Sequence, residues 1–362
     1  MRAANRRTEP TAQPQDSGDS QAPSEGGARP QEGAQDGPQT RRSRNAARRA
    51  RRLLEKEADA MPVVEPTGPQ QARVVDAELV QPAPRGGLVE TFQRPYLLRL
   101  IVSRQLAQMY AASLLGLAWS YVQPAMRFGV YYVVMGFILK LHLGTPYFAL
   151  HLFTGIVVVH YFGETWSGGT RSIWQNKGLV QKMRMPREIF PVAAMLVAAY
   201  HTFPQLIVLV LFCLLSGWHV TWVAVGAGAL GVAILVTFAM AMGLFFSALN
   251  VFFRDFQNIV QTIMQFMHFL VPMMYPFTLV WEAHATHPWL YNIYVANPIS
   301  QAVLLLQRLF WWPLIEDTDG LGRHFPPDMY VRGGITLVIC VLLLWVAQKF
   351  FSRVEGKFPE RL

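Results

Sequence analysis

The stretch that decides the fold runs from Ile189 to Phe253 and reads IFPVAAMLVAAYHTFPQLIVLVLFCLLSGWHVTWVAVGAGALGVAILVTFAMAMGLFFSALNVFF. It contains no Asp, Glu, Lys or Arg, which the surface of a water-soluble domain of this length would need. A helix needs about 20 apolar residues to cross a bilayer, so this stretch can cross twice, with a turn at Ser216–His219. We therefore predict an all-α integral membrane protein.

Four more apolar segments, found by working outward from this stretch, raise the predicted number of transmembrane helices to six. Their limits are set where charged and turn-forming residues interrupt the apolar runs. The predicted spans are about Ala125–Leu141, Phe148–Trp166, Ile189–Leu215, Thr221–Asn250, Gln257–Trp281 and Gly333–Gln348.

Two other apolar segments are predicted to enter the membrane without crossing it. Phe92–Pro124 carries three arginines, and each costs about 2.5–3.5 kcal/mol at the centre of a transmembrane helix, so an interfacial helix fits better. Asn297–Pro313, NPISQAVLLLQRLFWWP, is short and bounded by prolines. That pattern favours an outer re-entrant element over a seventh span.

The basic residues predict which side of the membrane each loop faces, because cytoplasmic loops carry an excess of Lys and Arg. Six spans with both termini in the cytoplasm place most of these basic residues on the inner side. The membrane is expected to be the cytoplasmic membrane of a bacterium. Lys140 is an exception, with a stem long enough to reach the outer interface. The inner basic residues are then Arg171, Lys177, Lys182, Arg184, Arg187, Arg254, Lys349, Arg353, Lys357 and Arg361.

Residues 1–90 differ in composition from the transmembrane domain predicted at 91–362. They are rich in Pro, Gln, Gly and Ser and lack apolar clusters, which is typical of a disordered tail. Arginines crowd between Arg41 and Arg52. They suit binding to anionic lipid, at about 1 kcal/mol per basic residue, or a solvated run that marks the cytoplasmic side. A nucleic-acid arm is conceivable, but no nucleic-acid partner is expected.

No catalytic constellation is found in the sequence. GxxxxGK[ST], HExxH and GxSxG are absent, so we predict no enzyme, no bound metal and no cofactor in this chain. His160, His201 and His268 lie in predicted spans, where a neutral imidazole that hydrogen-bonds between helices is the expected role. Glu164 stands near the inner end of the second span and can reach the interface. An ion-coupled carrier is therefore weakly supported.

Five segments in a fixed order resemble the membrane subunit of ABC-2 type polysaccharide exporters, which handle O-antigen, teichoic acid and mycobacterial galactan. The resemblance covers Leu88–Leu362 and rests on the order of the motifs rather than on any one of them. The segments are SLLGLAWSYVQP, NKGLVQKMRMPREIFP, LNVFFRDFQNIVQTIMQFMHFLVPMMYP, NPISQAVLLLQR and FFSRVEGKFPERL.

The resemblance implies a homodimer bound to two copies of a separate ABC ATP-binding subunit, which would hold ATP and Mg²⁺. It also implies export of an undecaprenyl-diphosphate-linked glycan, with an interfacial gate helix before the first span. Met185 stands where relatives have an aromatic residue. The implied ATPase-coupling residues are Asn176, Pro186, Arg187, Glu188, Arg254 and Asp255, and Asn297 and Pro298 match the outer element.

Two further sets of residues are predicted to meet the substrate. Arginines of the interfacial helix are expected to attract the lipid diphosphate, and aromatic rings of the first two spans are expected to stack on sugars, although core packing is the alternative for the rings. The arginines are Arg94, Arg99 and Arg104. The aromatics are Phe128, Tyr131, Tyr132, Tyr161, Phe162 and Trp166.

The bias of the tail towards Ala, Arg, Gly and Pro suggests an actinobacterium, which makes galactan the first choice of substrate, ahead of O-antigen or teichoic acid. Three alternatives stay open at this point. They are an ABC-2 exporter of a drug or of a lipid without a long glycan, a membrane-embedded polyprenyl-phosphate glycosyltransferase, and a membrane anchor.

Overall fold

The computed structural model describes residues 52, 87–111, 114, 116–183, 185–315 and 325–362. The chain divides into two compact units, residues 1–77 and 78–362, and only Arg52 of the first unit is described. Most of the predicted disordered tail, and Arg184, therefore lie outside the described residues. All regular structure in the described part is helical, with no strand, in agreement with the predicted all-α class.

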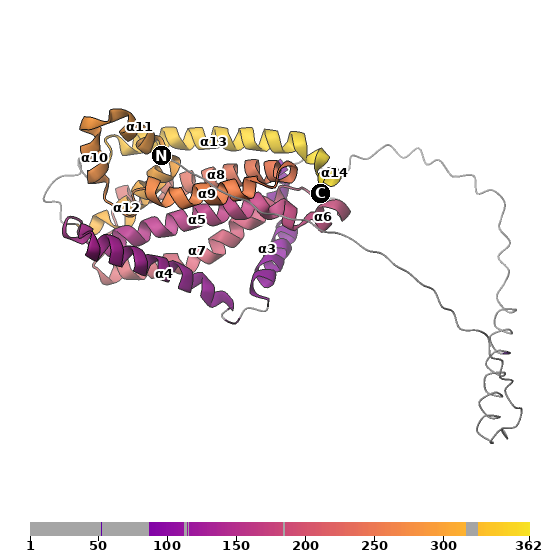
Figure 1. Ribbon diagram of the computed structural model, residues 1–362, viewed down its shortest axis with the longest axis horizontal. Coiled ribbons are helices and arrows are strands. Elements are labelled where there is room, and N and C mark those ends of the chain that lie inside the picture. Colours follow the sequence, from indigo (N-terminus) through magenta and orange to yellow (C-terminus); the bar gives the residue numbers. More distant parts are fainter. Residues whose placement is uncertain (1–51, 53–86, 112–113, 115, 184, 316–324) are drawn as a thin grey trace, which may run out of the picture. The chain divides into compact units, whose positions relative to one another are not determined.

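The centre of the 78–362 unit is α8 (Trp222–Phe252), which packs against α5 (Phe148–Gln175), α12 (Pro298–Phe310) and α13 (Met329–Val354). Figure 1 shows α5, α8, α9 and α13 running side by side. α7 (Ile189–Leu215) covers the other side of α5. The core is apolar because each of these helices buries large side chains against its neighbours.

The contact between α5 and α8 is close because glycines face one another. A Cβ atom added at Gly169 would lie only 2.8 Å from the Cα atom of Gly243. Small residues at such crossings let two helix backbones approach, which is how helices associate where no water is present to drive burial.

Three helices of the described chain are long and apolar enough to cross a membrane: Ile189–Leu215, Trp222–Phe252 and Met329–Arg361. The first has the limits predicted for the third span, and the second agrees with the predicted fourth span to within a turn. Both follow from the charge-free stretch, which leaves a helix no polar face to expose. The full set of six spans stays a prediction.

The predicted first span corresponds to α4 (Trp119–Tyr131), which begins before Ala125, and continues without interruption into the π-helix η2 (Tyr132–Ile138). A π-helix closes its hydrogen bonds over five residues instead of four, as the bond from the Leu139 amide to the Val134 carbonyl shows at 3.0 Å. Such turns are rare and occur often at functional sites.

The predicted fifth span is not one helix. It is broken into α9 (Phe256–Leu270) and α10 (Phe277–Thr286), since the intervening VPMMYP contains two prolines that cannot donate backbone hydrogen bonds. The break is buried, and its carbonyls are satisfied from α12: Ser300 donates to Leu270 at 3.3 Å and Gln307 to Pro272 at 2.8 Å.

The Asn-Pro pair predicted for the outer element starts α12. The Asn297 side chain accepts a hydrogen bond from the Ile299 amide at 3.1 Å, and Pro298 occupies the first turn, where a missing N–H is harmless. α12 is buried along almost its whole length, so it is a core helix of the described domain.

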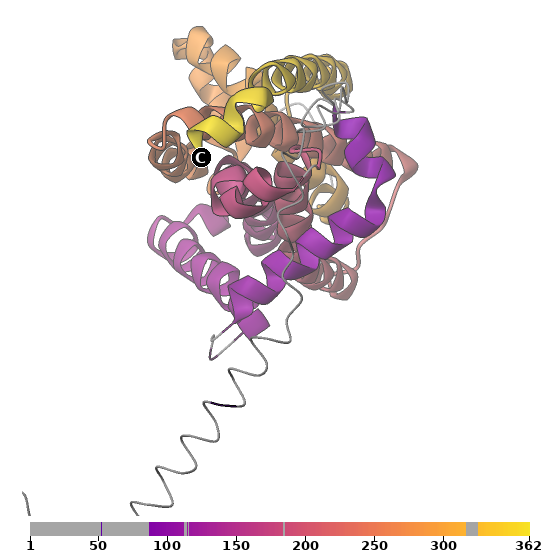
Figure 2. The same cartoon turned by 90° about the vertical axis from the view of Figure 1, so that its right-hand side faces the viewer.

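One end of the domain carries α3 (Pro95–Tyr110), α6 (Lys177–Lys182) and α14 (Phe358–Arg361), and the opposite end carries α10 and α11 (Pro288–Ala296). Figure 2 looks at the first of these ends and shows α3 crossing the ends of the other helices. α3 packs mainly against α7, and two of its side chains, Leu98 and Ile101, are buried.

Candidate functional site

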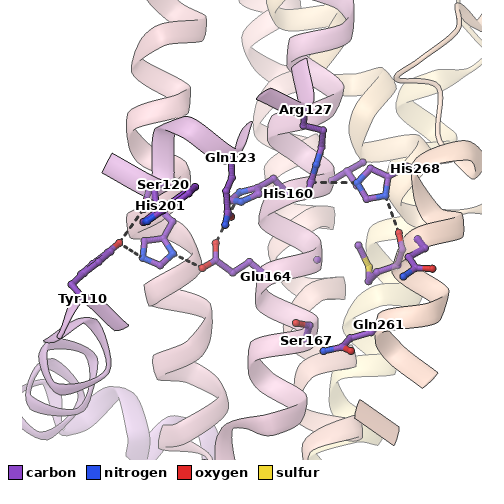
Figure 3. A pocket seen from close by; sticks show the side chains of 15 residues that line it. Tyr110, Ser120, Gln123, Arg127, His160, Glu164, Ser167, His201, Gln261 and His268 are labelled. Carbon is purple, nitrogen blue, oxygen red and sulfur yellow. Dashed lines mark hydrogen bonds and ion pairs between the residues drawn. The ribbon is translucent and has the colours of Figure 1, made fainter. Parts of the chain in front are cut away.

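A polar cavity of about 450 Å³, open to the surface, lies where five helices of the domain meet. Its wall combines charged, imidazole, amide and hydroxyl groups, which apolar helices contain rarely and mostly for a function. Figure 3 shows these groups turned towards one another. The lining residues are Tyr110 on α3; Trp119, Ser120, Gln123 and Arg127 on α4; Val159, His160, Gly163, Glu164 and Ser167 on α5; His201 on α7; and Gln261, Met264, Gln265 and His268 on α9.

The acidic end of the cavity is a chain of hydrogen bonds through His201. Its Nδ1 atom bonds the Glu164 carboxylate, and its Nε2 atom lies 2.7 Å from the Tyr110 hydroxyl. A proton on Nδ1 makes His201 a donor to Glu164 and an acceptor from Tyr110. Tyr110 in turn lies 3.0 Å from the Ser120 hydroxyl, so this chain joins α3, α4, α5 and α7. The second Glu164 oxygen lies 4.0 Å from Nδ1 of His160.

The basic end is formed by Arg127 and His268. The Arg127 guanidinium lies 3.4 Å from Nε2 of His268, whose Nδ1 atom is 2.9 Å from the Met264 carbonyl. Nδ1 must carry the proton to donate to that carbonyl, so Nε2 is an acceptor and Arg127 is its donor. In Figure 3 this pair and the Glu164–His201 pair stand at opposite ends of the cavity.

A second cavity of about 350 Å³ lies between α3, α5 and α7 and shares Glu164 with the first. It is lined by Arg171, by the amides of Gln105, Gln108, Gln175 and Asn176, and by several apolar groups. Because a cation and four amides line it, this cavity offers hydrogen-bond donors to an anionic or hydroxylated group.

The arginines predicted to attract a lipid diphosphate lie elsewhere. Arg94, Arg99 and Arg104 are exposed on α3 and its N-terminal side, and none of them lines either cavity. Arg94 forms an ion pair with Glu90 at 2.6 Å. An exposed arrangement suits attraction of an anionic headgroup at the surface, so their predicted role stays a prediction.

The predicted coupling residues before α7 are buried. Arg187 and Glu188 are 5% and 1% exposed, Pro186 is buried, and Asn176 donates to the Ser172 carbonyl at 2.8 Å, which closes the end of α5. Burial lowers the pKa of the Arg187 guanidinium, while the nearby carboxylates of Glu355 and Glu188 oppose that shift.

These charges meet the C-terminal end of the described chain. Gln348 of α13 donates to the Glu188 carboxylate at 2.9 Å, and the Arg187 guanidinium lies over the Phe358 ring at 5.7 Å. Phe358 is fully buried. We call Arg187, Glu188, Gln348, Glu355 and Phe358 the buried charge cluster. It fixes the beginning of α7 to the end of α13.

The predicted pair Arg254–Asp255 lies in the exposed turn between α8 and α9. The Arg254 guanidinium stacks on the Trp174 ring at 3.7 Å, and the Lys177 ammonium lies 4.8 Å from the same ring. Trp174 therefore brings this turn next to the start of α6.

The predicted passage aromatics fall into two groups. Phe162 and Trp166 are buried and pack on rings of α8, and Tyr161 is buried beside a separate apolar cavity, while their place along a glycan passage stays a prediction. Phe128 stacks on Tyr132 at 5.5 Å between ring centroids, and Tyr131 lies edge-on to His268 at 6.4 Å. Only the α4–η2 group lies near the polar cavity.

Sequence reasoning treated the cavity residues one at a time and did not single out Arg127. The signal was present, because an arginine inside a predicted span is itself unusual. His160 and Glu164 also stand four residues apart, which places them on one helix face. No sequence pattern connects either of them to His201.

Comparisons with known proteins place the chain. It is 24% identical to the O-antigen export system permease protein RfbA of Myxococcus xanthus, over 75% of this chain and 98% of that protein. It is also 24% identical to a protein of the same name from Klebsiella pneumoniae, over 74% of this chain and 95% of the relative. The family description "ABC-2 type transporter" matches residues 96–311, which is more than half of the chain. The chain therefore belongs to the ABC-2 type transporter family.

Proposed function

We propose that the chain is the membrane-spanning permease subunit of an ABC exporter that moves a lipid-linked polysaccharide across the cytoplasmic membrane. The observation that carries this proposal is the match to O-antigen export permeases over nearly their full length. The polar cavity supports it, because amides, hydroxyls and an indole suit sugar hydroxyls and sugar faces. A separate subunit would bind and hydrolyse ATP.

In this proposal the six spans are α4–η2, α5, α7, α8, α9–α10 and α13. Both termini are cytoplasmic, α3 lies at the inner interface, and α12 is the outer re-entrant element. The end that carries α3, α6 and α14 is then the cytoplasmic one. The exposed Lys177 and Lys182 of α6 support that orientation through the positive-inside rule.

Coupling to the ATP-binding subunit is proposed to use α6 as the contact surface. Two permease copies would bind two ABC subunits, with the exposed lysines of α6 facing the ATPase. Arg187 and Glu188 are too buried to touch a partner, so their part is to transmit movement of α6 to α7 and α13 through the buried charge cluster. Arg187 and Glu188 would thus act in coupling as a rigid connection behind the contact surface.

The substrate is proposed to be a glycan on undecaprenyl diphosphate, with actinobacterial galactan as first choice and O-antigen or teichoic acid next. Depletion of the chain in its host should cause one lipid-linked glycan to accumulate, and mass spectrometry of the lipid extract would identify it. Absence of any accumulated lipid-linked glycan would contradict the proposed export role.

The coupling proposal is tested by charge reversal on α6. Lys177→Glu with Lys182→Glu should leave the protein folded, because both side chains are exposed, while export stops and the ABC subunit no longer co-purifies. Lys349→Glu, an exposed lysine of α13, is the matched control and should keep both properties. Normal export by the α6 variant would contradict the assignment.

A further inference from the structure

Arg127 on α4 is a cation with no ion-pair partner within 4.0 Å among the described residues. Its hydrogen bond is the 3.4 Å contact with His268. The side chain is partly buried, and an arginine within a transmembrane segment is usually paired or faces a cavity that serves a function.

The contact with His268 orients Arg127 and leaves its charge unbalanced. Since Nδ1 of His268 donates to the Met264 carbonyl, Nε2 is a neutral acceptor that takes one guanidinium N–H. A guanidinium has five N–H donors, so several stay available to a ligand in the cavity. The geometry therefore holds the guanidinium in place while keeping its fork open.

The carboxylate in the same cavity lies at the far end from Arg127 in Figure 3. One Glu164 oxygen bonds His201, and the other lies 4.0 Å from His160 without a hydrogen bond to any described residue. The cavity thus has an acidic end around Glu164 and a separate basic end around Arg127. Gln123 stands on α4 one turn from Arg127, and Gln265 lines the cavity from α9.

We propose that the Arg127 end of the polar cavity is a binding site for an oxyanion of the transported molecule, a phosphate or a carboxylate. Arg127 binds the oxyanion through two guanidinium N–H groups, His268 positions Arg127, and the amides of Gln123 and Gln265 bind adjacent oxygens. The source of the oxyanion is either the diphosphate of a lipid carrier or an acidic sugar. That this anion belongs to a transported molecule rests on the proposed export function, whereas the site itself does not.

The test is binding to the full chain in lipid nanodiscs without an ATPase. The probes are farnesyl diphosphate, uncharged farnesol and tetragalacturonic acid. Wild type should bind farnesyl diphosphate, tetragalacturonic acid or both at least about tenfold more tightly than farnesol, the size expected for a charge-assisted hydrogen bond. A preference for farnesyl diphosphate would identify a lipid diphosphate as the source of the oxyanion, and a preference for tetragalacturonic acid would identify an acidic sugar. No preference for either anion over farnesol would overturn the proposal.

Arg127→Gln should abolish the preference for the anion while farnesol binding, which serves as the folding control, is retained. Arg353→Gln, an exposed arginine on α13, is the matched control and should keep the preference. An unchanged preference in Arg127→Gln, or an equal loss in Arg353→Gln, would overturn the assignment. If Arg127→Gln does not fold, Arg127→Lys decides: its preference should fall several-fold, because an ammonium lacks the fork, and an unchanged preference would again refute the site.

These outcomes are separate from those of the export experiments. Binding by the isolated chain does not depend on an ABC partner or on glycan accumulation. A chain that binds the anion through Arg127 but exports no glycan would refute the proposed function and leave the site standing. Normal export by Arg127→Gln, together with no anion preference in the wild-type chain, would refute the site alone.

Discussion

Charged groups in the buried charge cluster and in the polar cavity differ in how their charges are balanced. In the buried charge cluster, Arg187 has two carboxylates nearby and a phenyl ring over its guanidinium. In the polar cavity, Arg127 has only an imidazole. The first arrangement is sealed and holds two helices in register, whereas the second has space beside the cation. The difference separates a structural charge from a charge available to a ligand.

The largest loss of stability is expected when the buried charge cluster loses its cation. Arg187→Met removes a buried cation from beside the carboxylates of Glu188 and Glu355, so the free energy of unfolding should fall by about 3–5 kcal/mol. Denaturant titration in detergent micelles measures it. Adding Glu355→Gln to Arg187→Met should recover part of the loss, and Arg99→Met, at an exposed site, should change little. Equal stability of Arg187→Met and wild type would contradict a sealed cluster.

Two glycines of α5 lie in different surroundings: Gly169 packs against α8, and Gly163 lines the polar cavity. Gly169→Ala places a methyl group against the backbone of Gly243, 2.8 Å away, and should cost up to about 3 kcal/mol of unfolding free energy. Gly163→Ala meets only the terminal methyl of Met264, at 2.6 Å, which lines the cavity and can move. Thermal unfolding of both variants should therefore rank Gly169→Ala far below Gly163→Ala, and the reverse order would show that the cavity wall is rigid.

The acidic end of the cavity should hold α3 in place. His201→Phe removes both hydrogen bonds of the imidazole and leaves Tyr110 and Glu164 without them, so amide protection in α3 should fall about tenfold by hydrogen exchange, with α8 unchanged. Tyr110→Phe keeps the His201–Glu164 bond and should have a smaller effect. Full protection of α3 in His201→Phe would show that packing by Leu98 and Ile101 suffices.

The smallest effect is expected at the exposed turn. Arg254→Gln removes one cation from the Trp174 ring, and an exposed cation–π contact contributes about 0.5–1 kcal/mol. Arg254→Lys keeps a cation and should lose less. Thermal denaturation of the two variants measures the difference, and a loss as large as that of Arg187→Met would place Arg254 among the sealed charges.

Much of the helical framework could be predicted from the sequence because the membrane imposes it. The charge-free stretch fixes α7 and α8, since a helix is the way for a single apolar segment to satisfy its own backbone hydrogen bonds. The break of the fifth span at VPMMYP was not predicted. There two prolines end one helix, and side chains of α12 donate hydrogen bonds to the free carbonyls. Those donors come from residues far along the chain, and no local sequence pattern predicts them.

The candidate site was predictable only in pieces. The role of the Asn297–Pro298 pair as a helix start follows from local chemistry. The burial of Arg187 and Glu188 does not, because it depends on Gln348 and Phe358 of the C-terminal segment. The cavity depends in the same way on five helices converging, and a run of isolated polar residues does not say which of them will meet.

The π-helix that follows α4 has a consequence for how related chains can diverge. A π-turn contains one residue more than an α-turn, so deletion of a single residue within Tyr132–Ile138 would restore regular α-winding while the segments on either side keep nearly the same rotation. The same deletion in a regular α-helix would turn everything beyond it by about 100°. A change of one residue in this segment would thus be absorbed without disturbing Arg127 and Gln123, which precede it.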